Sequence, residues 1–191
     1  EGEDYTVSYT DAEGNEKTDF TNVTGTIKVT ITGTGNYSGA VERTYQITPA
    51  TLTVNADAQS KTYGEDDPEL TYEAPAVVGE ETPAFTGALT REPGEEVGTY
   101  DIEQGDLAMA DNEETGFKAS NYTLKYNGAQ LEITDKSISG GQDMSVDTPA
   151  DKTYNGSEQK WAPTVKDGDE TLVEGEDYTV SYTDAEGNEK T

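Results

Sequence analysis

The sequence predicts an all-β protein, an elongated tandem of small β-sandwich modules of the Ig-like kind, with a β-grasp-like sheet as the alternative. Apolar and polar residues alternate with a period of two in many short runs, and β-branched threonine is abundant. No window holds a sustained apolar stripe at helical spacing. Hydrophobic residues are 31% of the chain, below the roughly 45–50% of typical globular domains. Thin cores in small modules are therefore expected.

The predicted strands follow one another with turn-forming residues between them. Their alternating apolar positions are, in order, Tyr5, Val7 and Tyr9; Ile27, Val29 and Ile31; Val41, Tyr45 and Ile47; Leu52 and Val54; Leu70 and Tyr72; Tyr122, Leu124 and Tyr126; and Leu131 and Ile133. Turns are predicted at 33–36, 92–94 and 167–169, where glycine, proline, asparagine and aspartate gather. Asn127-Gly128 is predicted to be either a two-residue hairpin turn or a bulge in one long strand.

An internal repeat is the strongest feature of the sequence. Residues 1–18 recur without change as residues 174–191, an offset of 173. We therefore expect the chain to hold one full period, 1–173, followed by the start of the next, and to be taken from a longer protein that repeats this unit in series.

The period itself divides into two modules of nearly equal length. Module A spans 50–136. Module B is split, with its C-terminal half at 1–49 and its N-terminal half at 137–191. Both modules carry a Lys-Thr-Tyr step near the start and an Asn-Tyr step before the last strand. The joints are short, so neighbouring modules are expected to be stiffly coupled.

Charge excludes several classes of partner. The chain has 40 acidic and 12 basic residues, a formal net charge of −28. This field repels phosphate backbones and anionic membranes, so neither nucleic-acid binding nor membrane insertion is expected. Histidine and cysteine are absent, and the sequence contains neither a Gly-x-Ser-x-Gly elbow nor a phosphate-cradling loop. We therefore expect no enzymatic activity, with no catalytic and no cofactor-binding residue.

Three blocks resemble a known family. KTYGEDDPELTY (61–72), TGALTREPGEEVGTYDI (86–102) and NYTLKYNGAQLEIT (121–134) closely resemble the MBG domain of YGX type, which occurs in tandem in bacterial surface proteins. Module B looks like related repeats of Gram-positive surface adhesins, through KTYNG, VEGEDYTVSY and ITGTGNYSGAVERTYQI. The resemblance implies an extracellular setting at the bacterial cell wall or surface and an adhesion-related or spacer role. It implies no catalytic residues.

Clusters of oxygen ligands in predicted turns make calcium the one candidate ion. The candidates are Glu65, Asp66 and Asp67 in one cluster and Asp167, Asp169 and Glu170 in another. Calcium takes six to eight such ligands. No EF-hand loop is present in the sequence, and solvated acidic turns are the alternative interpretation.

A covalent crosslink is a second candidate feature, since intramolecular Lys–Asn isopeptide bonds occur in bacterial surface stalks. Lys61 and Lys152 lie near module starts, while Asn121 and Asn36 lie near module ends. The alternative interpretation takes Lys-Thr-Tyr as a strand end and Asn-Tyr as a turn entry.

These observations predict a structural stalk or spacer repeat of an extracellular bacterial surface adhesin or fibre, which projects a distal binding region. Two alternatives stay open: a module that itself binds mucin or another host glycan, and a repeat of an S-layer or pilus-like polymer. The expected partners are neighbouring repeats of the same protein. Because the two halves of module B are separated by module A, we expect head-to-tail strand complementation between copies of this chain.

Overall fold

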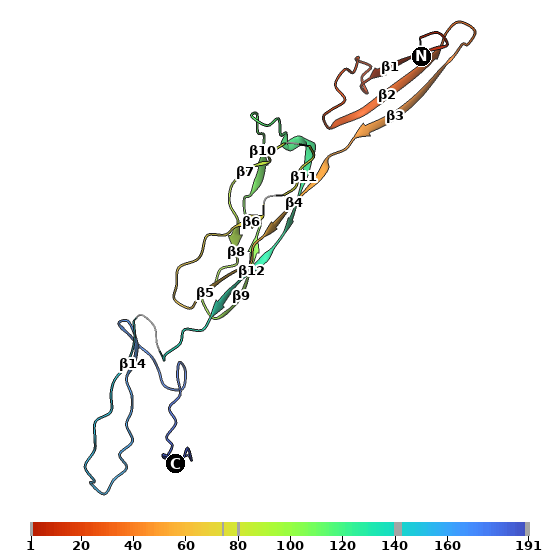
Figure 1. The fold of residues 1–191 in the computed structure, drawn as a ribbon. Coiled ribbons are helices and arrows are strands. Elements are labelled where there is room, and N and C mark those ends of the chain that lie inside the picture. The colour runs from red at the N-terminus through yellow and green to blue at the C-terminus, as the bar shows by residue number, and fades with distance from the viewer. Residues whose placement is uncertain (1, 74, 80, 140–142, 190–191) are drawn as a thin grey trace. The chain divides into compact units, whose positions relative to one another are not determined.

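A computed structural model describes residues 2–73, 75–79, 81–139 and 143–189 as a succession of short strands (Figure 1). The chain divides into two compact units, residues 1–134 and 135–191. The predicted all-β class is confirmed, whereas the choice between Ig-like sandwich and β-grasp-like sheet stays a prediction. Over the described residues, no helix has the length and apolar character needed to cross a membrane.

The first unit begins with a three-stranded antiparallel sheet of β1 (Tyr5–Thr10), β2 (Thr24–Gly33) and β3 (Ala40–Ile47), with β2 in the centre. The register pairs Val7 with Ile31 and Ile31 with Val41, so the alternating apolar positions of all three strands share one face. Threonine and charged residues fill the other face. The three strands predicted from alternation in this region are confirmed.

A long parallel pair of strands runs through module A. One side is β4 (Ala50–Ala56) followed by β5 (Gln59–Thr62), and the other is β11 (Tyr122–Asn127) followed by β12 (Ala129–Thr134). β11 pairs with β4 and β12 pairs with β5, both in parallel and in one continuous register, as in Tyr126 with Val54 and Leu131 with Gln59. Asn127-Gly128 is therefore an interruption in one long strand and not a hairpin turn.

Shorter strands flank this parallel pair. β6 (Tyr72–Glu73) adds antiparallel to β4; β9 (Gly98–Glu103) adds antiparallel to β12, and β8 (Thr90–Arg91) extends that sheet. β7 (Ala84–Thr86) and β10 (Ala108–Ala110) form a separate pair, and the 3-10 helix η1 (Ala119–Asn121) leads into β11. Leu70 lies before β6 rather than within a strand, yet it packs against the core.

The hydrophobic core of the first unit is concentrated in module A. Its buried members come from the parallel pair and from the loops that cover it: Leu52, Val54, Leu89, Ile102, Leu107, Phe117, Tyr122 and Leu131. Phe117 stacks on Tyr122 with ring centroids 5.0 Å apart. In the described part of residues 1–49, by contrast, Ile27 is the one buried hydrophobic side chain. The three-stranded sheet therefore has a thin core of its own.

The second unit is held by a small antiparallel sheet with β14 (Val165–Asp167) between β13 (Met144–Val146) and β15 (Glu170–Thr171). Val165 is the buried hydrophobic side chain among its described residues. Lys136 Nζ binds both carboxylate oxygens of Asp167, at 2.6 and 2.8 Å. The unit therefore depends on polar contacts more than module A does.

Candidate functional site

A cluster of four charged side chains joins the first two family-like blocks in module A. Lys61, the last residue but one of β5, is nearly buried, with 4% of its side chain exposed. Its Nζ donates to Asp67 Oδ1 at 2.7 Å and to Glu95 Oε2 at 2.5 Å. The buried ammonium group is therefore held by two carboxylates from separate loops.

Arg91 completes this charge cluster, which consists of Lys61, Asp67, Arg91 and Glu95. Its Nε and Nη2 donate to the two oxygens of Asp67 at 2.7 and 3.0 Å, a bidentate pairing, and Nη2 also donates to Glu95 at 2.5 Å. Nη1 donates to the Gly94 carbonyl at 2.6 Å. The guanidinium also lies over the ring of Tyr100, 5.5 Å from its centroid. The cluster fixes the loop at 92–97 to the end of β5.

The pairing shifts the ionisation of all four groups in the direction that favours charge. Hydrogen bonds from Arg91, and then from Lys61, lower the pKa of Asp67 to about 2. Hydrogen bonds from Lys61 and then Arg91 lower the pKa of Glu95. The bond to Asp67, followed by that to Glu95, raises the pKa of Lys61, and the bond to Asp67 also raises the pKa of Arg91. All four groups are therefore charged at neutral pH, which suits a structural clamp.

The predicted calcium ligands are distributed over other contacts. Asp67 is bound by Arg91 and Lys61, Asp167 by Lys136, and Glu65 accepts a hydrogen bond from the Thr62 N–H at 2.8 Å. Asp66, Asp169 and Glu170 are exposed. Across residues 2–73, 75–79, 81–139 and 143–189, no three acidic side chains gather in a group able to hold a metal. The described residues therefore supply no converging set of calcium ligands. A calcium site stays a prediction.

The structure corrects the predicted crosslink between Lys61 and Asn121. The parallel register sets Lys61 beside Ile133, whereas Asn121 precedes Tyr122, which lies beside Ala50. Residues 50 and 61 are separated by roughly 35 Å of strand, so Lys61 and Asn121 lie at opposite ends of the module. Lys61 is also already bound by two carboxylates.

The other two crosslink candidates lie in separate units. Lys152 Nζ donates to the carbonyl of Lys160 at 2.8 Å, and Asn36 is exposed in the turn between β2 and β3. A bond between Lys152 and Asn36 stays a prediction.

Asn121 instead connects module A to the preceding sheet within the first unit. Its Oδ1 accepts from the Val23 N–H at 2.8 Å, and its Nδ2 donates to Asn22 Oδ1 at 3.0 Å. Asn22 is in turn held by Asp19, whose Oδ2 accepts from Asn22 Nδ2 at 2.8 Å. Hydrogen bonds from the Thr21 side chain and main chain, and from Asn22, lower the pKa of Asp19. The joint between 1–49 and module A is therefore fixed by side-chain hydrogen bonds.

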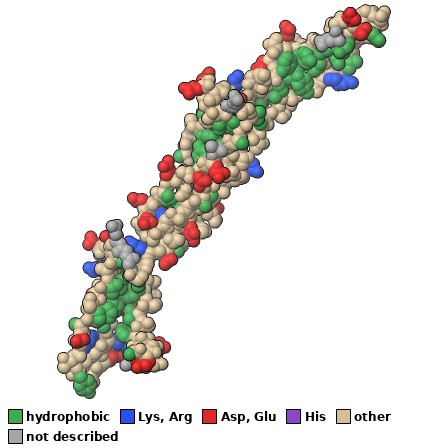
Figure 2. Space-filling model, in the orientation of Figure 1, with side chains coloured by type: hydrophobic (Ala, Val, Ile, Leu, Met, Phe, Trp, Pro, Cys, Tyr) green, Lys and Arg blue, Asp and Glu red, His purple; other side chains and the backbone are tan. Residues whose placement is uncertain are grey.

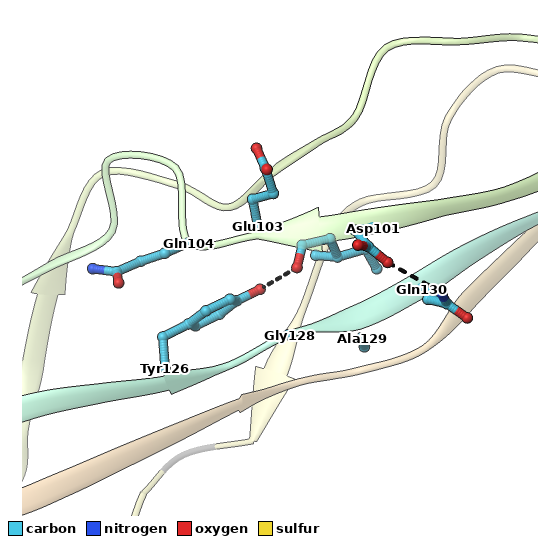
Figure 3. Close-up of a pocket in the computed structure, with 8 residues that line it drawn as sticks. Asp101, Glu103, Gln104, Tyr126, Gly128, Ala129 and Gln130 are labelled. Atoms are coloured by element: carbon cyan, nitrogen blue, oxygen red, sulfur yellow. Dashed lines mark hydrogen bonds between the residues drawn. The ribbon is translucent and has the colours of Figure 1, made fainter.

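The interruption in the long strand opens a shallow pocket of about 480 Å³ beside Gly128 (Figure 3). Two pairs of its polar groups are engaged with one another: Tyr126 Oη donates to the Ile102 carbonyl at 2.8 Å, and Gln130 donates to Asp101 at 3.0 Å. A Cβ at Gly128 would lie 2.8 Å from the Ile102 carbonyl oxygen, so the close approach requires glycine. Burial, and then the nearby charge of Glu103, raise the pKa of Tyr126. The arrangement is that of a packed strand irregularity rather than a reaction site.

The apolar face of the β1–β3 sheet is only partly covered, with Phe20 packed on Tyr9. The face is formed by Tyr5, Val7, Tyr9, Val29, Ile31, Val41 and Tyr45, with the charged Arg43 opposite Val29 and with the buried Ile27. Tyr5 is 40% and Val41 48% exposed, and a hollow of about 490 Å³ lies between β1, Ile31 and Val41. Figure 2 shows hydrophobic side chains gathered at the surface over the part that Figure 1 labels β1–β3. A sheet face of this kind normally packs against another layer.

The charge cluster and the Asn121 joint are not evident from the sequence. Arg91 and Glu95 lie far from Asp67 along the chain, and only folding brings them together. A lysine inside an alternating strand, such as Lys61, was the one available signal, because lysine is seldom buried unless it is paired.

Of three comparisons with known proteins, one found a match. The family model described as MBG domain (YGX type) matches residues 52–132, from the first residues of β4 to the end region of β12. Neither the comparison with curated proteins nor that with solved structures found a match. The matched range contains most of the long parallel pair, the charge cluster and Asn121. Residues 52–132 of this chain are therefore similar to the MBG domain (YGX type), a repeat family of surface proteins.

Proposed function

We propose that this chain is a structural spacer repeat of an extracellular bacterial surface adhesin or fibre, which holds a distal binding region away from the cell surface. The observation that carries the proposal is the unchanged recurrence of residues 1–18 at 174–191 around a domain of a surface-protein repeat family. Repeats of this kind extend a protein in proportion to their number, because each one contacts only its neighbours.

The contacts of the described residues support a spacer role. The first unit couples its sheet to module A through Asn121, Asn22 and Val23, and the charge cluster fixes a loop of module A to β5. Such contacts limit bending between and within modules. The net charge of −28 opposes side-by-side aggregation of copies, because like charges repel over about 8 Å at physiological salt.

Two experiments test this proposal. Small-angle scattering of proteins with one, two and four periods measures the maximum dimension, and a spacer predicts that it rises in proportion to the number of periods. A compact particle whose dimension grows only slowly would contradict the spacer role. Antibody labelling of intact cells tests the extracellular location, and labelling only after lysis would contradict it.

Binding of host glycan or mucin is a second candidate, because the structure supplies exposed aromatic rings. Tyr37 is 63% and Tyr154 89% exposed, and such rings stack on sugars. A glycan array probed with the intact chain tests this role. Binding that is lost in Tyr154→Ala or Tyr37→Ala would favour it, and an array without binding would leave the spacer role alone.

A further inference from the structure

The two identical terminal segments, 1–18 and 174–191, have different secondary structure. In the first, Tyr5–Thr10 forms strand β1 and pairs with β2 along its whole length. In the second, the same sequence at 178–183 belongs to no strand of the described chain. Because the residues are the same, the difference comes from the partner and not from local preference.

The turns on both sides of this segment are nevertheless alike in the two copies. The N–H of Gly2 donates to the Tyr5 carbonyl at 2.7 Å, and that of Gly175 donates to Tyr178 at 2.8 Å. The N–H of Asn15 donates to Asp11, and that of Asn188 to Asp184, each at 2.8 Å. The turns at both ends of the second copy therefore already match those of β1, and within residues 2–73, 75–79, 81–139 and 143–189 it pairs with no strand like β2.

The second copy is covered by a different segment from the first, in which Phe20 packs on Tyr9 with ring centroids 5.0 Å apart. Tyr178 and Tyr182 correspond to Tyr5 and Tyr9, which lie on the apolar face of the β1–β3 sheet. Tyr178 donates to the Pro163 carbonyl at 3.2 Å and Tyr182 to the Trp161 carbonyl at 2.5 Å. If residues 178–183 occupied the position of β1 and kept these two hydrogen bonds, residues 161–163 would lie over the apolar face of the sheet.

We propose that residues 178–183 of one molecule replace β1 in the β1–β3 sheet of a second copy, and that residues 161–163 then cover its apolar face. The exchange is head to tail, so it continues from copy to copy. Within a longer protein, the same contact joins each period to the next. The inference concerns assembly alone and does not depend on the adhesin role.

The exchange leaves the strand ladder unchanged, because one strand replaces another of identical sequence. The gain is the burial of side chains that stay in the sheet, such as Ile31 and Val41, which are exposed in the single chain. The cost is the electrostatic repulsion between two acidic chains, and dissolved salt screens this repulsion. Association is therefore expected to be stronger at high than at low NaCl concentration.

Matched proline variants of the full chain test the exchange. Thr34 N–H donates to the Asp4 carbonyl, and hydrogen-bonded pairs alternate along an antiparallel ladder, so the N–H of Ser8, opposite Thr30, also points to β2. Proline at position 8 removes this donor from the resident strand, whereas proline at position 181 removes it from the incoming strand. The same substitution at equivalent positions of the two repeat copies is therefore expected to have opposite effects on association.

Sedimentation equilibrium at high NaCl concentration measures the result. The unsubstituted chain is expected to form concentration-dependent oligomers, Ser181→Pro is expected to remain monomeric, and Ser8→Pro is expected to associate at least about tenfold more tightly. Equal association of the two variants overturns the proposal, and so does a monomeric unsubstituted chain together with a monomeric Ser8→Pro variant.

A disulfide experiment keeps the proposal falsifiable if Ser8→Pro fails to fold. The chain has no cysteine. Val7 lies opposite Ile31, so the exchange sets Val180 of one copy opposite Ile31 of the next. The double variant Ile31→Cys with Val180→Cys is expected to give a ladder of disulfide-linked oligomers on a non-reducing gel, while each single variant stops at dimers. An internally linked monomer, or double-variant products that stop at dimers, overturns the proposal.

Discussion

The side-chain carbonyl oxygen of Asn121 accepts a hydrogen bond from the main-chain N–H of Val23 at 2.8 Å, between segments that are far apart in the sequence. Together with the Asn121–Asn22 bond at 3.0 Å, it ties the first sheet to module A. Both bonds are partly shielded from water, which strengthens them relative to exposed ones.

Replacement of Asn121 by alanine is expected to loosen this joint and leave module A folded. The loss of these hydrogen bonds costs about 1 kcal/mol, so hydrogen exchange at the Val23 amide should become about fivefold faster. Asn127→Ala is the matched control, because its side chain donates to Asn55 Oδ1 at 2.7 Å within module A. Equal effects of both variants on Val23 would contradict the assignment.

Replacement of Lys61 by methionine is expected to lower the free energy of unfolding of module A by about 1–3 kcal/mol. The substitution keeps the buried stem but leaves Asp67 and Glu95 without the ammonium group between them. Urea unfolding measures the change. Lys28→Met is the control, since Lys28 and Glu42 form an exposed pair 3.3 Å apart, worth at most about 1 kcal/mol. A smaller loss for Lys61→Met than for Lys28→Met would contradict the clamp.

Stability is expected to fall as the pH drops from about 4 towards 2, in part through Asp67. Its pKa is about 2 in the folded protein, against about 3.9 in an unfolded chain. In this range the unfolded state binds more protons, so the contribution of Asp67 is complete above about pH 4 and is lost as the pH approaches 2. Urea unfolding of the unsubstituted chain and of Asp67→Asn should therefore differ less near pH 2.5 than near pH 5.

Replacement of Gly87 by alanine is expected to disrupt module A. Gly87 has a φ of +78°, and an added Cβ would lie 2.2 Å from the Asp106 carbonyl oxygen, so both the backbone and the packing must change. Gly116, with a φ of +77° and open space around its Cβ position, is the matched control and should lose only about 1–2 kcal/mol. Thermal unfolding distinguishes them, and similar losses would show that the close contact is unimportant.

Much of the fold could be predicted because alternation is a local property. The apolar positions at Tyr5, Val7 and Tyr9 indicate a strand, and β1 forms there. The identical residues at 178–183 form no strand in the described chain, which shows the limit of local reasoning. A strand forms only when it pairs with another strand, and its own residues do not specify which strand that is.

The parallel pairing could not be predicted for a related reason. The strand runs at 52–54 and 122–126 show the same alternation whether they pair in parallel or antiparallel. Their true register sets Lys61 beside Ile133 rather than near Asn121, and this register decides which polar residues meet. The register also determines which side chains Arg91 contacts, so its role in the charge cluster could not be predicted from the sequence.

The long parallel pair also determines how module A bears load. The chain enters at Ala50, where β4 starts, and leaves at Thr134, where β12 ends, so these points lie at opposite ends of the paired strands. Tension transmitted through the backbone acts along the strands, and it shears the inter-strand hydrogen bonds all together instead of peeling them one by one. Such a geometry resists extension by force even when the hydrophobic core is modest.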